Sequence, residues 1–139
     1  MKRHPDLQQL SSEHHRALVI AQRLINACAA VGVDAGADAE LLQQAKKFVA
    51  DDMEPHFRWE EEALLPALAA VGERELVAKT VDEHAELRAL AARLDEPLAQ
   101  ARFGELLKQH VRFEERTLFE AVQGRLNADV LKAIGEYRG

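Results

Sequence analysis

The chain has 139 residues, of which 47% are hydrophobic and 30% are charged, and its formal net charge is −6. These values are typical of one globular domain, residues 1–139, and exclude a disordered chain. Acidic and basic residues are interleaved, so no basic stripe predicts a nucleic-acid partner. Cys28 is the only cysteine, which excludes an intrachain disulfide and a zinc site made of thiolates.

The N-terminal segment MKRHPDLQQL has no apolar run after its basic residues, which argues against a secretory signal. No stretch reaches the roughly 18 consecutive apolar residues that a membrane-spanning helix requires. We therefore expect a cytoplasmic protein without a membrane partner.

The common residues Ala, Leu, Glu, Gln and Arg favour helices. Short breakers such as VGVDAGAD and Gly72 divide the chain into four long helical patterns and one short one, at residues 5–31, 38–71, 73–94, 97–123 and 127–135. Asp38 and Asn127 are the expected N-caps of the second and fifth helices. Because short connections make consecutive helices antiparallel, we predict an all-α, up-down-up-down four-helix bundle with a short C-terminal fifth helix.

Two related segments place polar residues on faces that should be buried. They are HFRWEEEALLPAL, residues 56–68, and HVRFEERTLFEAV, residues 110–122. At about 100° of rotation per residue, His56 and Glu60 lie within an apolar stripe that continues through Ala63 and Ala67. His110 and Glu114 lie within a second stripe, which continues through Thr117, Leu118 and Ala121. The i, i+4 spacing puts each His and Glu on one face, so both pairs should point into the bundle.

The first and third helices each add one histidine. His14 completes the apolar stripe of the first helix, whereas His15 lies about 100° away from it. His84 lies on the flank of the stripe of the third helix, about 50° from its centre by the same construction. A rotated helix would exchange His14 for His15, or Glu114 for Glu115, and these alternatives stay open.

The chain also repeats its own pattern. EHHRAL followed by the segment at 56–68 parallels EHAELRAL followed by the segment at 110–122. Two helical hairpins of one pattern, related by approximate two-fold symmetry, would bring their polar residues together at the symmetry axis.

Buried carboxylates and imidazoles in such numbers need a cation. Neutral imidazoles and ionised carboxylates suit divalent first-row metals, and glutamates on opposite helices could bridge two of them. We therefore predict a dinuclear site with open positions. Its expected ligands are His14, His56, Glu60, His84, His110 and Glu114. Glu61, Glu62 and Glu115 are expected to be solvated residues on the flanks of their helices. Any one of the four inward histidines, taken alone, would ordinarily be interpreted as a hydrogen-bonded histidine of the core.

The order H … H-x3-E … H … H-x3-E resembles that of the hemerythrin-like HHE cation-binding domain, over roughly residues 6–123. The resemblance implies two iron ions in a non-haem, carboxylate-bridged di-iron centre. It also implies that Glu60 and Glu114 bridge, that His14 and His56 serve one metal, and that His84 and His110 serve the other. Oxygen-carrying hemerythrins place a further histidine where this chain has Arg88, which argues against reversible oxygen carriage.

The resemblance implies a protein that binds or senses O2 or a related small ligand such as NO or peroxide, or that handles iron. Two alternatives are kept. One is a di-iron redox enzyme acting on O2, peroxide or NO, and the other is an interaction bundle whose metals only stabilise the fold. An enzyme would need a proton donor near the open position, and the sequence offers no convincing one.

Overall fold

The computed structural model describes residues 3–31 and 36–138, and every regular element within these ranges is helical, as predicted. The elements in chain order are η1 (Pro5–Leu7), α1 (Gln8–Val31), α2 (Ala39–Phe48), η2 (Val49–Met53), α3 (Glu54–Trp59), η3 (Glu60–Leu64), α4 (Leu65–Ala70), α5 (Arg74–Ala91), α6 (Pro97–Phe113), η4 (Glu114–Leu118), α7 (Phe119–Arg125) and α8 (Ala128–Gly135). Half of the first predicted breaker, residues 32–35, lies outside the described ranges.

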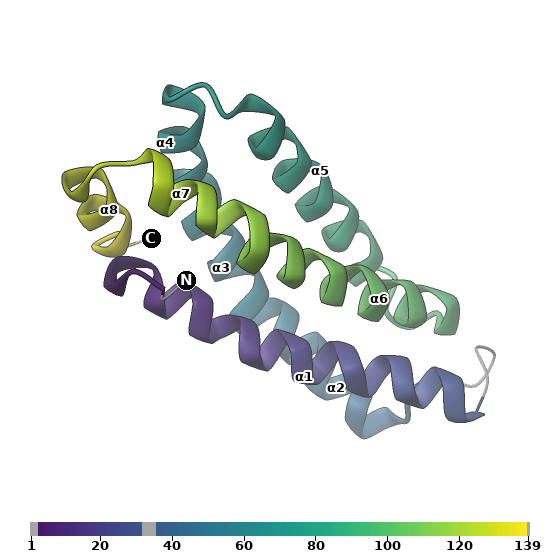
Figure 1. The fold of residues 1–139 in the computed structure, drawn as a ribbon. Helices are drawn as coiled ribbons and strands as arrows, with labels where there is room; N and C mark the ends of the chain where they lie inside the picture. The colour runs from purple at the N-terminus through teal and green to yellow at the C-terminus, as the bar shows by residue number, and fades with distance from the viewer. Residues whose placement is uncertain (1–2, 32–35, 139) are drawn as a thin grey trace.

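The elements join into long helical runs that lie beside one another (Figure 1). α1 packs along α6 and also contacts α2, while α5 packs against α6 and α4. α8 packs against η1, so the two ends of the described chain lie close together. Among the described helices, none has both the length and the apolar character needed to cross a membrane.

The ends of the helices carry the residues that the sequence predicts. Asp38 Oδ1 accepts a hydrogen bond from the Leu41 backbone N–H over 2.8 Å at the start of α2. The side chain of Asn127 does the same at the start of α8, accepting from the backbone N–H of Val130 over 3.0 Å. Gly72 follows α4 with φ of 89°, a left-handed conformation that glycine adopts without strain. These local signals set where the runs begin and end.

Single π-helical turns interrupt the second and fourth runs within the described residues. Pro55 follows η2 and Pro66 follows η3, and each π turn contains the residue four positions before its proline. A wider turn relieves the clash between a proline ring and the carbonyl at that position. The disturbance expected from the prolines therefore takes the form of a π turn. η4 has no following proline, but η3 and η4 begin at Glu60 and Glu114.

These turns correct the predicted burial pattern downstream of each glutamate. Ala63 and Ala67 were expected to be buried and are only partly so, whereas Leu64 and Leu68 are fully enclosed. In the fourth run Leu118 is buried as expected, but Thr117 is exposed, and Val122 replaces Ala121 in the core. The physical reason is the same in both runs: a π turn holds one more residue than an α turn, so the buried face moves on by one position.

The apolar core consists of two clusters on either side of a polar layer. One cluster is centred on Ala17–Leu24 of α1 and on parts of α2, α3, α5 and α6. The other joins Leu7 and Leu10 to residues of η3, α4, η4, α7 and α8. The buried polar residues between the two clusters are His14, His56, Glu60, His84, His110 and Glu114.

Candidate metal centre

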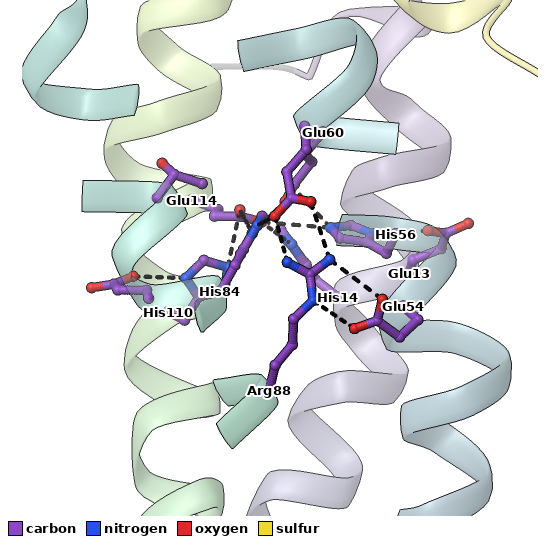
Figure 2. A network of polar contacts seen from close by, with 12 residues as sticks. Glu13, His14, Glu54, His56, Glu60, His84, Arg88, His110 and Glu114 are labelled. Carbon is purple, nitrogen blue, oxygen red and sulfur yellow. Dashed lines mark hydrogen bonds and ion pairs between the residues drawn. The ribbon is translucent and has the colours of Figure 1, made fainter. Parts of the chain in front are cut away.

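The six residues predicted to bind metal all lie in this buried layer, and their side chains meet (Figure 2). The side chains of Glu60, His84 and Glu114 are fully enclosed. The donor atoms form two groups, and within each group all atoms lie within 4.8 Å of one another. The first group is His14, His56, Glu60 and Glu114, and the second is Glu60, His84, His110 and Glu114.

The first group is arranged around one oxygen of each glutamate. His14 Nε2 lies 2.7 Å from Glu114 Oε1. His56 Nε2 lies 3.1 Å from Glu60 Oε2 and 3.5 Å from Glu114 Oε1. The i, i+4 spacing along α3 and η3 sets the contact between His56 and Glu60.

The second group uses the other oxygen of each glutamate. His84 Nε2 lies 3.0 Å from Glu60 Oε1 and 3.7 Å from Glu114 Oε2. His110 Nε2 lies 3.0 Å from Glu114 Oε2. Each carboxylate thus presents one oxygen to each group, which is the arrangement required of a carboxylate that bridges two metal ions.

Each of the four histidines is also held from behind by a second glutamate. The Nδ1 atoms of His14 and His84 lie 2.7 Å from Glu115 and Glu61, respectively. This contradicts the expectation that Glu61 and Glu115 are solvated flank residues. It also separates Glu114, which faces the centre, from Glu115, which lies behind a histidine. A carboxylate behind the imidazole fixes the orientation of a metal-binding histidine and strengthens its donor nitrogen.

Sequence reasoning missed the other two of these carboxylates. Glu13 Oε1 lies 2.8 Å from His56 Nδ1, and Glu83 Oε1 lies 2.7 Å from His110 Nδ1. The signal was present in the repeat, because a glutamate directly precedes both His14 and His84. The contacts follow the same repeat. The pair of Glu13 and His56 is equivalent to the pair of Glu83 and His110. The pair of Glu61 and His84 is equivalent to the pair of Glu115 and His14.

The surrounding carboxylates favour protonation of the imidazoles when no metal is present. Burial opposes this and is the largest single influence on the pKa of His84, but Glu114 and Glu60 together outweigh it and raise that pKa to about 9. For His110, burial is again outweighed, by Glu114 and Glu83, and the pKa is raised to about 10. The pKa values of His14 and His56 are also raised. Glu114 and Glu115 overcome burial for His14, and Glu60 and Glu114 do so for His56.

The carboxylates respond in the opposite direction. Burial favours the neutral form of Glu114, but the imidazoles, led by His110, hold its pKa well below the usual range. The carboxylates behind the histidines also have lowered pKa values. For Glu13, Glu83 and Glu115 the hydrogen bonds to imidazoles lead in outweighing burial, and for Glu61 the hydrogen bond from Arg88 leads, followed by that to His84. These five carboxylates therefore stay ionised and attract positive charge, which protons on the imidazoles or metal ions can supply.

Hydrogen bonding alone does not satisfy the centre of the site. Five buried side-chain atoms lack a hydrogen-bond partner in the described part of the chain. One is Arg3 Nε, and the other four lie in this site: Glu60 Oε1, His84 Nε2, His110 Nε2 and Glu114 Oε2. They face one another over 3.0 to 3.7 Å without hydrogen-bond alignment. Buried polar atoms without partners are costly. These four are the donor atoms of the second group, so the residues present fit a metal ion there.

The remaining residues singled out in the sequence lie outside the polar layer. His15 is exposed and lines a surface groove between α1 and α2, consistent with the choice of His14 as the inward residue. Cys28 is buried in the apolar core. Tyr137 lies beyond the end of α8, and its hydroxyl donates a hydrogen bond to Glu62. Arg88 forms ion pairs with Glu54 and Glu61, which lie outside the six inner residues.

Comparison with known proteins identifies the family of the chain. Searches of curated proteins and of solved structures each found no match. The family model of the hemerythrin HHE cation-binding domain matches residues 6–122, a span that runs from η1 to α7 and contains all six residues of the polar layer. The chain therefore belongs to the hemerythrin HHE cation-binding domain family.

Proposed function

We propose that this protein binds two metal ions, which are iron in the cell, as a carboxylate-bridged non-haem pair. His14 and His56 hold one ion, His84 and His110 hold the other, and Glu60 and Glu114 bridge them. The observation that carries the proposal is the division of the glutamate oxygens, because each carboxylate presents one oxygen to each histidine pair.

The charge of the site supports two divalent ions. Fully protonated, the four imidazoles would carry four positive charges, which is the charge that two divalent ions would supply in their place. Imidazole and carboxylate donors without a thiolate suit several divalent first-row metals, including iron. The membership of the chain in a cation-binding family supports the same conclusion.

The second part of the proposal is that the metal pair binds or senses a small ligand such as O2, NO or peroxide, or serves to handle iron. Six protein side chains are too few to fill two octahedral coordination spheres, so positions remain for water or a small ligand. A redox-active metal pair would supply electron transfer to that ligand. The protein residues orient the donors through the carboxylates behind them, and the two apolar clusters exclude bulk water.

We also propose that residues 1–139 form one domain in which the long runs make an up-down-up-down antiparallel four-helix bundle. The contacts of α1 with α6 and α2, and of α5 with α4 and α6, support this topology. Both polar segments then enter the bundle at the same level, between the two apolar clusters.

Elemental analysis tests the metal content. Protein expressed in iron-replete medium should purify with about two metal ions per chain, mainly iron. A content near zero, or only tightly held zinc, would contradict the di-iron proposal.

Optical spectroscopy tests the small-ligand proposal. Protein reduced without air should change its spectrum when air is admitted, and azide added to the oxidised protein should change it again. We expect a ferric state that only a reductant reverses, as in a sensor or an iron-handling protein. Clean cycling through repeated deoxygenation would instead favour an oxygen carrier, and no response to air, NO or peroxide would favour a purely structural metal site.

A further inference from the structure

Arg88 is bound by carboxylates on both sides of its guanidinium group. It lies one turn after His84 on α5. Its Nη1 and Nη2 donate hydrogen bonds to the two oxygens of Glu61 over 2.8 and 3.1 Å. Its Nε and Nη2 donate to the two oxygens of Glu54 over 2.6 and 3.3 Å. Two such forked pairs need a planar group with several fixed donors, which arginine has and lysine lacks.

These pairs lead directly to the metal centre through Glu61. The same oxygen of Glu61 that accepts from Arg88 Nη1 also lies 2.7 Å from His84 Nδ1. A second connection runs through Phe57, whose ring stacks on His84 with centroids 3.8 Å apart. The guanidinium carbon of Arg88 lies 5.3 Å from the centroid of that same ring. Arg88 therefore contacts both Glu61, which lies behind His84, and Phe57, which stacks on it.

The other hairpin has no equivalent of this arrangement. Leu18 stands four residues after His14, where Arg88 stands after His84, and Lys108 stands seven residues before Glu115, where Glu54 stands before Glu61. Glu115 is held instead by Ser11 and by Arg3 from the N-terminal segment. The approximate two-fold symmetry thus holds for the inner residues and for the carboxylates behind them, and it ends at the next layer.

We propose that Arg88 is a positioning residue for the His84 side of the metal centre and makes the two metal positions inequivalent. By holding both oxygens of Glu61, it fixes the carboxylate that orients His84, and Glu54 fixes Arg88 in turn. The metal position that uses His84 then depends on this forked contact, and the position that uses His14 and His56 does not. The inference rests on the proposed function, since it requires two bound ions.

The central test is Arg88→Lys, with Co²⁺ as the probe. Lysine keeps the positive charge and a long stem but cannot fork onto two carboxylates, so the variant separates geometry from charge. Co²⁺-loaded protein is titrated with a chelator, and the loss of each ion is followed by absorption. One of the two ions should bind at least about tenfold more weakly than in the wild type, as removal of a supporting contact behind a ligand typically causes. The other should change by less than about twofold. Arg88→Met should behave like Arg88→Lys.

Arg93→Met is the matched control, because Arg93 forms a similar two-point pair with Glu96 on the surface. It should leave both affinities unchanged. NMR of the Zn²⁺-loaded protein assigns the affected position. In Arg88→Lys, the Nδ1–H resonance of His84 should shift, while those of His14 and His56 should stay in place.

The outcomes separate the two proposals. Two ions in the wild type and unchanged affinities in Arg88→Lys would overturn the role of Arg88 and leave the metal-pair proposal standing. Equal weakening of both ions, or a shift of all the histidine resonances, would also overturn it, because the effect would then be a general loss of structure. Fewer than two ions bound to the wild type would overturn the metal pair itself, and this inference with it.

Discussion

Glu114 and Glu115 are neighbours in sequence, yet one faces the centre of the site and the other lies behind a histidine. One residue step turns a helix by about 100°, which is enough to move a carboxylate from the donor layer to the layer behind it. Glu60 and Glu61 divide in the same way. The two layers therefore come from adjacent pairs of glutamates, with Glu13 and Glu83 added from the neighbouring helices.

At the residue scale, the structure predicts opposite results for His14→Ala and His15→Ala. His14 Nε2 lies 2.7 Å from Glu114 Oε1, so its loss should remove about half of the bound metal. His15 is exposed, and its loss should leave the metal content unchanged. Elemental analysis of both purified variants decides the matter. Loss of metal from the His15 variant alone would mean that α1 is rotated from the position described.

The carboxylates behind the histidines provide a second prediction. Glu83→Gln replaces the acceptor 2.7 Å from His110 Nδ1 by an amide, and metal affinity should fall by roughly 10- to 100-fold. Glu86→Gln, an exposed change on the same helix, should have no effect. Competition with a chelator measures both variants, and equal affinities would show that Glu83 does not support metal binding through His110.

At the scale of elements, the π turns decide which residues of the second and fourth runs reach the core. After Glu60 and Glu114 the buried positions move on by one, and larger apolar residues, Leu64 and Leu118, occupy the buried positions. The size of these residues was a signal in the sequence, since Ala63 and Thr117 are smaller or polar. Two of the π turns, η3 and η4, begin at a glutamate of the donor layer, so the irregular helix coincides with the site there.

The packing of α1 against α6 depends on a glycine, and this can be tested with a matched pair of substitutions. A Cβ on Gly104 would lie 3.0 Å from the Ala21 backbone oxygen and 3.1 Å from Ile25 Cγ1, whereas a Cβ on Gly124 would meet nothing within 4 Å. Gly104→Ala should therefore destabilise the protein by about 1 kcal/mol despite the better helix propensity of alanine. Gly124→Ala should stabilise it by roughly 0.5–1 kcal/mol. Urea denaturation measures both, and stabilisation by Gly104→Ala would contradict the close approach of the two helices.

At the scale of the whole molecule, a strongly charged layer separates the two halves of the apolar core. Without a cation, this layer would be among the least stable parts of the fold, because the buried donors would repel one another or lack partners. Protons on the imidazoles reduce this repulsion in part, and metal ions can reduce it more completely. Metal binding and folding should therefore be coupled, and the sign of the coupling to pH follows from the pKa shifts.

We expect the metal-free protein to lose stability as the pH rises from about 6.5 to about 10. The ordinary pKa of histidine is 6.5, and folding raises it to about 9 for His84 and about 10 for His110. The folded state then binds more protons than the unfolded state across this range. This proton binding contributes fully to the free energy of unfolding below the pKa of the unfolded state. The contribution is lost as the pH rises through the pKa values of the folded state.

Urea denaturation with excess chelator at several pH values measures this effect. The metal-loaded protein should be more stable than the metal-free protein and should not show the same decline, because its imidazoles are already neutral. Metal-free stability that is flat or rises across this range would contradict the prediction. Equal stability with and without chelator would argue against metal in the polar layer.

The sequence by itself determined the helical class, the ends of the helices and the six inward residues. Helix propensity, caps and the i, i+4 spacing are local properties, and the apolar stripe indicates which way His14, His56 and His110 point. Only the tertiary structure decided the π turns, the pairing of Glu61 with His84 and of Glu13 with His56, and the contacts of Arg88. These depend on the distance and axial register between helices far apart in sequence. No local pattern encodes such register, because it results from packing the whole core at once.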